Sequence, residues 1–301
     1  MPDPLLVDVH LHLYATKEAG EHEKATYEIW EYGHKPDVVF SRFGGEVDEA
    51  LTAMGEAGFA HAVVVNLFAL DLLDEPTRAA GSATHAERLI RLNQWACDEA
   101  AAHPELSVFV AADPFVLGGE EGAEHLREMV EGHAARGIKI HPAAQRFMPD
   151  DPRMGAIYRT CVDLGLPVLS HAGAARGGAR FADPASFVPV LQAYPDLSLV
   201  LAHLGGARWA QTAEFARSFP HVSFDLCEII EWTGAPNAPS REDLARLIQD
   251  VGPERVMLGT DFPWYDLDRT VDLVMDLPVL GTEEKESILG VNAARILRLP
   301  V

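Results

Sequence analysis

The chain has few cysteines for its 301 residues. The three that it has, Cys97, Cys161 and Cys227, are far apart and odd in number. This pattern predicts reduced thiols in a cytoplasmic protein rather than a disulfide framework. None of them belongs to a Cys-x-x-Cys pair, so the sequence offers no paired thiolates for a metal site.

Long apolar runs and basic clusters are missing as well. No apolar run approaches the roughly 20 residues that span a bilayer, and the N-terminus has no basic region followed by an apolar stretch, so no secretion signal is expected. Acidic residues number 46 against 24 basic ones, which gives a formal net charge of −22. Nucleic acids and anionic membranes are bound through clustered lysine and arginine. We therefore expect neither as a partner, and expect a small-molecule substrate instead.

A glycine-rich turn after the first apolar run is also absent, although a nucleotide-binding doubly wound sheet would carry one there. That run ends in His-Leu-His-Leu-Tyr. What the chain does have is eight short runs rich in Val, Leu and Ile, typical of parallel strands buried on both faces. The predicted strands are Leu5–Leu13, Ala60–Leu67, Ser107–Phe115, Gly137–His141, Pro167–His171, Leu197–His203, Val222–Cys227 and Val256–Asp261.

Amphipathic stretches with helical periodicity lie between these runs and after the last one. Later in the chain the strand-and-helix pairs recur at about 30 residues, the size of one βα unit. The predicted helices are Val47–Ala57, Ala83–Ala102, Glu120–Ala135, Met154–Leu164, Ser186–Ala193, Ala207–Ser218, Arg241–Val251, Leu267–Met275 and Thr282–Leu297.

Eight such units predict an α/β fold, the (β/α)8 TIM barrel. The chain has no linker and no low-complexity segment, so residues 1–301 are expected to form a single domain. The segments Tyr14–Glu46 and Phe68–Ser82 follow the first two predicted strands and are longer than the other connections. We predict that they are long loops on the catalytic face of the barrel, where loops of this length can form a lid.

Polar residues within buried strands are the informative positions for function. In this chain they lie at the C-terminal ends of the predicted strands, which meet on one face of a barrel. His10 and His12 are two residues apart on the first strand. Both imidazoles are therefore predicted to enter the barrel mouth, while Val9 and Leu11 face the helices.

These histidines indicate a metal site. His171 ends the fifth predicted strand and Asp261 ends the eighth. Histidine and carboxylate ligands with an open coordination position suit a catalytic Zn²⁺, or Mn²⁺ or another first-row ion. We predict one divalent metal ion, with zinc as the first choice, held by four ligands: His10, His12, His171 and Asp261.

Two further strand-end residues leave the number of ions open. A buried lysine is costly unless it is paired or functional. Lys139, in the fourth strand, could pair with Asp8 or Asp261, contact an anionic substrate, or be carboxylated and bridge two ions. His203, at the end of the sixth strand, could bind a second ion, or polarise the substrate and move protons.

Three residues are predicted to contact the substrate, namely Lys139, Arg42 and Trp264. Lys139 offers an ammonium group, and Arg42 in the first long loop could clamp a substrate carboxylate. Trp264 is expected in the wall of the pocket, and Glu228, which follows the seventh strand, is a weaker candidate for the same wall. No motif in the long loops identifies the substrate.

Six motifs of this chain together resemble those of the amidohydrolase superfamily. They are Asp-Val-His10-Leu-His12, Gly-Ile-Lys139-Ile-His-Pro, Leu-Ser-His171-Ala-Gly, Leu-Ala-His203-Leu-Gly-Gly, Gly-Thr-Asp261-Phe-Pro-Trp and the tail Gly290-Val-Asn-Ala-Ala-Arg-Ile-Leu297. They are most similar to the amidohydrolase-related branch that includes aminocarboxymuconate-semialdehyde decarboxylase-like proteins. The resemblance covers nearly the whole chain and is weakly specific for substrate.

The resemblance implies a barrel with a single ion on the four predicted ligands and with His203 near the metal-bound water. In binuclear members of the superfamily a fourth-strand lysine is carboxylated and a sixth-strand histidine binds the second ion. This chain has both residue types, Lys139 and His203. The sequence therefore leaves open whether a second metal ion binds through a carboxylated Lys139.

Hydrolysis is the primary prediction for the reaction. A metal-activated water would attack a C–O or C–N bond of a lactone, ester or amide that carries a carboxylate. Asp261 would accept the proton of the water and return it to the leaving group, while His203 would stabilise the oxyanion or shuttle the proton.

Two other interpretations compete with hydrolysis. One is a metal-dependent non-oxidative decarboxylase, a lyase that uses the same site. The other is a barrel that binds metal without turnover, which the complete ligand set disfavours. The sequence leaves the oligomeric state open, although a homodimer is the commonest assembly.

Overall fold

The computed structural model describes residues 4–26, 30–70 and 82–301. Their strands form one eight-stranded parallel sheet in the order β1 to β8. The eight predicted strands are confirmed, and each is shorter than its apolar run because the run continues into the loops. The strands are β1 (Val7–Leu11), β2 (His61–Val65), β3 (Leu106–Ala111), β4 (Gly137–Ile140), β5 (Val168–Ser170), β6 (Leu199–Leu201), β7 (Ser223–Asp225) and β8 (Val256–Met257).

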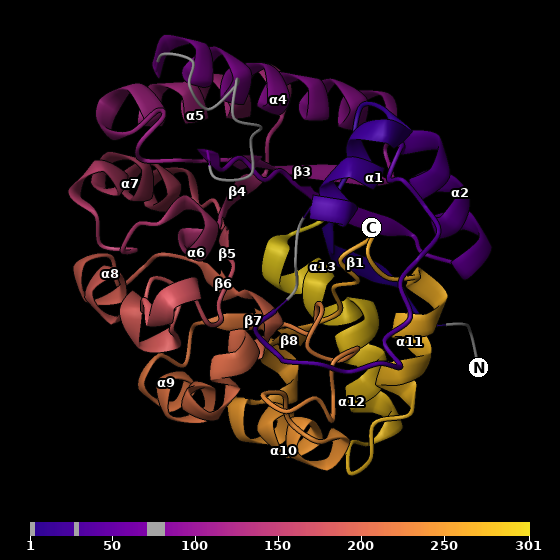
Figure 1. Ribbon diagram of the computed structural model, residues 1–301. Coiled ribbons are helices and arrows are strands. Elements are labelled where there is room, and N and C mark those ends of the chain that lie inside the picture. The colour runs from indigo at the N-terminus through magenta and orange to yellow at the C-terminus, as the bar shows by residue number, and fades with distance from the viewer. Residues whose placement is uncertain (1–3, 27–29, 71–81) are drawn as a thin grey trace.

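Helices follow the strands and surround them as a ring, so that the predicted (β/α)8 TIM barrel is confirmed (Figure 1). The α-helices are α1 (Lys17–Thr26), α2 (Val47–Ala57), α4 (Ser82–Ala102), α5 (Gly119–His133), α6 (Pro142–Gln145), α7 (Gly155–Leu164), α8 (Val188–Ala193), α9 (Thr212–Ser218), α10 (Arg241–Val251), α11 (Leu267–Met275), α12 (Thr282–Glu286) and α13 (Asn292–Leu297). Shorter helical turns are η2 (Pro152–Met154), η3 (Arg176–Gly178), η4 (Pro184–Phe187), η5 (Ala202–Gln211), η6 (Pro253–Arg255) and the π-helix η7 (Ser287–Val291).

The last strand returns to the first and joins the two edges of the sheet. The Val9 backbone N–H donates to the Leu258 carbonyl at 2.9 Å. Further along, Leu11 and Phe262 form a parallel bridge. This contact brings the segment after β8 against the end of β1, which is the arrangement that the metal site requires.

An irregularity in β1 decides which side chains enter the barrel. The register between β1 and β2 shifts between Asp8 and Leu11. Val9 belongs to the hydrophobic cluster inside the barrel, so the prediction that it faces the helices is wrong, whereas Leu11 does pack on the helix side. A bulge places two successive residues opposite one partner. The Asp8 carboxylate accepts a hydrogen bond from His10 N at 2.8 Å, which gives that N–H a partner at the bulge.

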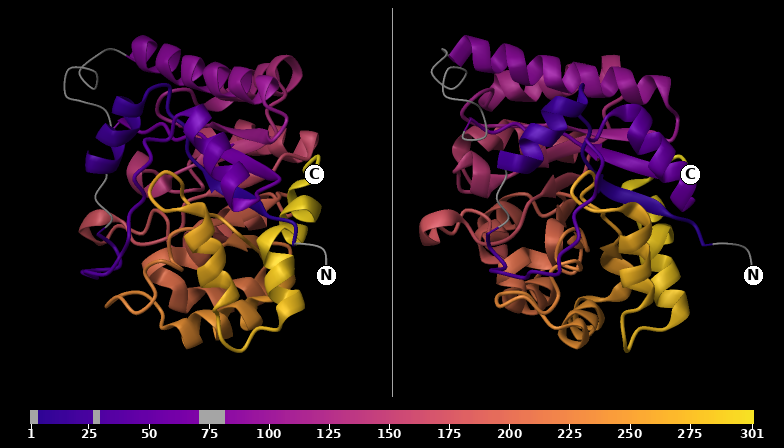
Figure 2. Two further views of the ribbon diagram at one scale, coloured as in Figure 1. Left: turned by 90° about the vertical axis from the view of Figure 1, so that its right-hand side faces the viewer. Right: turned by 45° about the vertical axis from the view of Figure 1, so that its right-hand side comes forward.

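The interior of the barrel is filled with apolar side chains below the strand ends. Residues of α13 join this interior cluster, so α13 covers the N-terminal end of the barrel. In the side views of Figure 2, α13 lies at one end of the barrel and α1 lies toward the other. The cluster includes Val7, Val63, Val65, Phe109, Leu169, Val200, Met257, Ala293 and Leu297.

The predicted helix over Thr282–Leu297 is divided in the structure into α12, the π-helix η7 and α13. Gly290 lies in η7, where a Cβ atom would stand 2.2 Å from the Leu5 carbonyl oxygen. A glycine here allows the helix to approach the chain just before β1. The backbone stays helical at Ser287 and Asn292, where these segments join, so the predicted helix is confirmed with a π-helical middle part.

The first predicted long loop, after β1, contains the helix α1, and its described residues 30–46 form turns and irregular backbone up to α2. Most of the second predicted loop, residues 71–81, lies outside the described residues. Among the helices that the structure describes, none is long and apolar enough to cross a membrane.

Candidate metal centre

A cavity of about 30 Å³ lies at the C-terminal ends of the strands. A space of this order holds an ion or a water molecule rather than a substrate. Its walls bring together nearly all of the predicted site residues from six different strand ends. The lining residues are His10, His12, Leu67, Lys139, His141, His171, His203, Glu228, Asp261 and Trp264.

Three of the four predicted ligands form one compact group. His12 Nε2 lies 3.2 Å from Asp261 Oδ1, and His10 Nε2 lies 3.9 Å from the same oxygen. One ligand atom from each of the three residues lies within 4.8 Å of the others. The backbone holds the group in place, because Asp261 N donates to the His10 carbonyl at 2.8 Å.

The protonation states of this group suit a metal ion, which needs neutral imidazoles and an ionised carboxylate. Burial and the nearby Lys139 ammonium hold the pKa of His10 well below its usual range. Burial alone would raise the pKa of Asp261, but the hydrogen bond from His12 and the imidazoles of His10 and His203 outweigh it and lower that pKa. The residues present therefore fit a divalent first-row ion.

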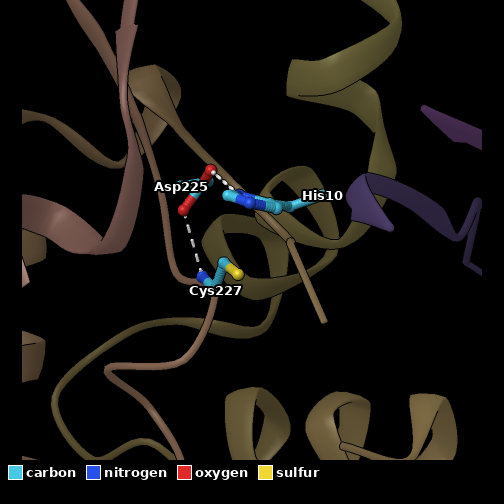
Figure 3. Close-up of side chains that lie close together, drawn as sticks. All are labelled: His10, Asp225 and Cys227. Carbon is cyan, nitrogen blue, oxygen red and sulfur yellow. Dashed lines mark hydrogen bonds and ion pairs between the residues drawn. The ribbon is translucent and has the colours of Figure 1, made fainter. Parts of the chain in front are cut away.

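A buried carboxylate beneath His10 sets the orientation of its ring (Figure 3). His10 Nδ1 lies 3.0 Å from Asp225 Oδ2, while Asp225 Oδ1 accepts hydrogen bonds from the backbone N–H groups of His203 at 2.8 Å and Cys227 at 3.2 Å. With Nδ1 bonded to the carboxylate, Nε2 is the nitrogen that faces the cavity. A carboxylate behind a ligating histidine is a common support for metal sites.

Cys227 also lies against this pair, and its sulfur could join His10 and Asp225 as a second group of ligands (Figure 3). These three residues do not suit a metal ion, however. Burial raises the pKa of the Cys227 thiol well above its usual range, so the thiolate that binds metals is disfavoured. Both oxygens of Asp225 are already engaged. We interpret these residues as support for His10.

Lys139 approaches the ligand group directly. Its Nζ lies 2.7 Å from His10 Nε2, and its side chain is buried. Burial lowers the pKa of Lys139 to about 8, against the opposing charges of Asp225 and its neighbours. Of the two partners predicted for this lysine, Asp8 is bonded to Thr260 instead. Lys139 therefore contacts the same nitrogen atom that a metal ion would use.

Three further histidines, His141, His171 and His203, lie beside this group and contact one another. His171 Nδ1 lies 3.0 Å from His203 Nε2, and the His141 ring stacks on the His171 ring with centroids 3.8 Å apart. His203 Nδ1 lies 2.9 Å from the Cys227 carbonyl oxygen. His171 thus shares the cavity with His10, His12 and Asp261, and its place as the fourth ligand stays a prediction.

The predicted substrate contacts divide into two locations. Trp264 lines the cavity, with its ring edge toward His12 at a centroid distance of 5.5 Å. Glu228 lines it as well, with Oε2 at 3.6 Å from His203 Nδ1. Arg42 is exposed and lines a different pocket, beside Phe40 and Asp266. The structure does not bring Arg42 to the histidines.

Asp225 was not among the predicted site residues; it lies inside the predicted strand Val222–Cys227 and is the last residue of β7. The available signal was a carboxylate in the buried motif Ser-Phe-Asp225, at the same level as the other strand-end residues. Its register partner Met257 lies inside the barrel. Residues paired across parallel strands point to the same side, so Asp225 also points inward.

A family model described as amidohydrolase matches residues 7–299. The chain belongs to the amidohydrolase family. The resemblance noted from the strand-end motifs is thereby confirmed. No curated protein sequence matches this chain.

Several solved structures share the barrel of this member of the amidohydrolase family over nearly its full length. A 5-carboxyvanillate decarboxylase, LigW, from Sphingomonas paucimobilis is 17% identical with a TM-score of 0.68, covering 99% of this chain and 100% of that one. A dihydroxybenzoic acid decarboxylase from Polaromonas sp. JS666, with bound manganese and the inhibitor 2-nitroresorcinol, is 16% identical with a TM-score of 0.72, covering 99% and 98%. A 2,6-dihydroxybenzoate decarboxylase from Rhizobium is 15% identical with a TM-score of 0.67, covering 100% of both chains. Identities this low show a shared fold.

Proposed function

We propose that this amidohydrolase-family protein is a metal-dependent non-oxidative decarboxylase of a small carboxylate-bearing substrate. The observation that carries the proposal is the buried His10–His12–Asp261 group with the Lys139 amine 2.7 Å from His10 Nε2. A ligand set for a cation and an ammonium group thus share one cavity. Both attract the same kind of ligand, an anionic oxygen.

His10, His12 and Asp261 would hold the ion, with His171 as the fourth ligand. When bound, the ion supplies positive charge that binds substrate oxygens and stabilises negative charge developing on the substrate. Asp225 keeps Nε2 of His10 directed to the cavity. Lys139 would leave that nitrogen and contact the substrate carboxylate through Nζ.

Decarboxylation breaks the bond between the carboxylate carbon and its neighbour. The electron pair stays on the neighbouring carbon, CO₂ leaves, and that carbon takes a proton. His203 is the residue to which we assign this proton, at Nε2, since Nδ1 faces the Cys227 carbonyl. Glu228, whose Oε2 is 3.6 Å from Nδ1, lies beside this imidazole; burial raises the pKa of Glu228 well above its usual range, so it would face His203 as a neutral carboxyl group.

The similar structures favour decarboxylation over hydrolysis. The three reported above carry decarboxylase names, and one of them contains manganese. Each covers 99% or more of this chain. This supports the lyase that the sequence analysis held as an alternative, and it leaves the choice between zinc and manganese to experiment.

Hydrolysis is the second candidate, and one observation favours it. The low pKa of Asp261 keeps its carboxylate ionised, 3.2 Å from His12 and at the edge of the cavity. An ionised carboxylate is the form that accepts a proton from an attacking water. The family description, amidohydrolase, is consistent with this reaction as well.

The two reactions are separated by their products. Metal-free protein is loaded with Mn²⁺ or Zn²⁺ and incubated with hydroxybenzoates, including 2,6-dihydroxybenzoate and 5-carboxyvanillate, and separately with lactones and amides. We expect CO₂ release from an acid of the first panel. Asp261→Asn should lower that rate by about 100-fold or more, whereas His133→Ala, on the outer helix α5, should leave it unchanged. Acid release from the second panel without CO₂ from the first would establish a hydrolase instead.

A further inference from the structure

Glu31 is a buried carboxyl group that the proposed reaction does not use. It lies in the segment between α1 and α2, and its side chain belongs to the buried set at 6% exposure. Oε2 accepts a hydrogen bond from the Ala174 backbone N–H at 2.6 Å. The Ala207 backbone N–H, in the segment after β6, and the Tyr32 hydroxyl also interact favourably with this carboxyl group. Burial raises the pKa of Glu31 to about 7, which shows that this is an unfavourable place for a carboxylate.

Two glycines from different loops make room for this carboxyl group. A Cβ atom at Gly173 would lie 2.4 Å from Glu31 Oε2, and the three nearest atoms to it all belong to the Glu31 carboxyl group. A Cβ atom at Gly206 would lie 2.7 Å from Glu31 Oε1. Gly206 also has φ +53° and ψ −137°, a conformation that L-residues avoid. The carboxyl group therefore fills a gap that only glycine at both positions leaves open.

The two loops that meet at Glu31 carry two histidines of the metal centre. Gly173 follows His171 by two residues in the loop after β5, and Gly206 follows His203 by three residues after β6. The two imidazoles are 3.0 Å apart. Leu204, which lies between His203 and Gly206 in η5, has a positive φ of +46°. Residues other than glycine seldom adopt such an angle, so contacts from outside the turn after β6 are needed to hold it. Asp225 accepts a hydrogen bond from His203 N and Thr212 donates one to the Leu204 carbonyl. Glu31 adds a contact at Gly206, on the side of the turn that faces the loop after β5.

The segment that carries Glu31 is fixed at its other side. Asn237, in the connection between β7 and α10, donates from Nδ2 to the Glu31 carbonyl at 2.8 Å and from its backbone N–H to the Tyr32 carbonyl at 3.0 Å. The Tyr32 ring stacks on Trp232, with centroids 5.5 Å apart and planes inclined by 18°. The carboxyl group is therefore presented to the two glycines from a rigid backbone.

We propose that Glu31 is a positioning residue, which joins the loops after β5 and β6 and thereby fixes the distance between His171 and His203 in the metal centre. The inference rests on the proposed function in that it takes this cluster to be a metal site. It does not depend on which reaction the site performs.

Metal binding tests the inference without an activity assay. Co²⁺ is titrated into metal-free protein, and its visible absorption reports both the affinity and the ligand geometry. Glu31→Ala should bind Co²⁺ about tenfold more weakly or worse, as for loss of other residues that orient ligands, and should change the absorption spectrum. Glu31→Gln keeps the shape and an acceptor oxygen for Ala174 N, so it should restore binding close to that of the wild type. Asp113→Ala removes another buried carboxyl group, in the loop after β3, and should lower thermal stability without changing the Co²⁺ spectrum.

A double variant tests the contact itself. Gly173→Ala should weaken Co²⁺ binding because the new Cβ atom displaces the Glu31 carboxyl group. Adding Glu31→Ala removes the obstacle, so the double variant should be no worse than Glu31→Ala alone. The inference is overturned if folded Glu31→Ala binds Co²⁺ with the affinity and spectrum of the wild type, or if the effects of the two substitutions simply add. Failure of the wild type to bind Co²⁺ would instead contradict the proposed metal centre.

Discussion

At the scale of single residues, His10 is the side chain on which the candidate site depends most. Its two ring nitrogens have different neighbours, Asp225 at Nδ1 and Lys139 at Nε2. The first contact fixes the tautomer, because a carboxylate accepts a hydrogen bond and leaves the proton on Nδ1. The second occupies the nitrogen that would bind the ion. Metal binding therefore requires Asp225 to stay in place and Lys139 to move.

Replacing Asp225 by asparagine tests this assignment. The amide of Asp225→Asn can turn its NH₂ group toward His10 Nδ1, which would place the ring proton on Nε2 and block the metal-binding nitrogen. We expect the affinity for Zn²⁺ to fall by about 10- to 100-fold, measured by competition with a chromophoric chelator. The exposed Asp196→Asn is the matched control and should bind as the wild type does. Unchanged affinity in Asp225→Asn would remove Asp225 from the metal centre.

The site residues that lie at strand ends could be predicted from the sequence, because these ends converge on one face of a barrel. His10, His12, Lys139 and Asp261 end strands, and the barrel brings their side chains into one cavity. Arg42 was placed there too, but it belongs to a loop, and sequence does not give the path of a loop. Glu31 lies in the same loop and is buried against Gly173 and Gly206, in the loops that follow His171 and His203. The residues that flank Glu31 in the sequence give no sign that its carboxyl group is buried.

At the scale of elements, the hydrophobic pattern predicted the strands well because all eight are buried on both faces. It could not predict the bulge in β1, since Val9 suits either side of the sheet. The bulge depends on Asp8, whose carboxylate binds the backbone of both His10 and Thr260. The periodicity also predicted the last helix but not its π-helical part η7, where Gly290 lies close to the Leu5 carbonyl oxygen.

The contact between η7 and the start of β1 can be tested through stability. In Gly290→Ala the new Cβ atom would meet the Leu5 carbonyl oxygen at 2.2 Å, and backbone on both sides must shift. We expect a loss of about 1–3 kcal/mol in the free energy of unfolding, measured by urea denaturation of metal-free protein. Gly55→Ala, within α2 and with no atom within 4 Å of its new Cβ atom, should be neutral or stabilising. Equal stability of the two variants would contradict the close packing of η7.

At the scale of the whole molecule, the surface charge and the site charge have opposite signs. The formal net charge of −22 attracts divalent cations and repels anionic substrates. Lys139 and the buried imidazoles provide a local environment in which an anionic group can bind despite this field. An ion in the cavity would also join several strand ends, since its ligands come from β1 and from the segments after β5 and β8. Metal binding should therefore stabilise the whole barrel.

Thermal unfolding with and without metal checks this coupling. An ion that binds only the folded chain stabilises it by about 2.7 kcal/mol at a free concentration 100 times its Kd, which corresponds to a rise in Tm of roughly 5 °C. We expect this rise when Zn²⁺ or Mn²⁺ is added to metal-free protein and its reversal by a chelator. His12→Ala should abolish the rise, because His12 Nε2 lies 3.2 Å from Asp261 Oδ1 within the ligand group. His133→Ala removes a histidine of the outer helix α5 and should keep it. A rise of the same size in His12→Ala would show that the ion binds elsewhere on this acidic surface.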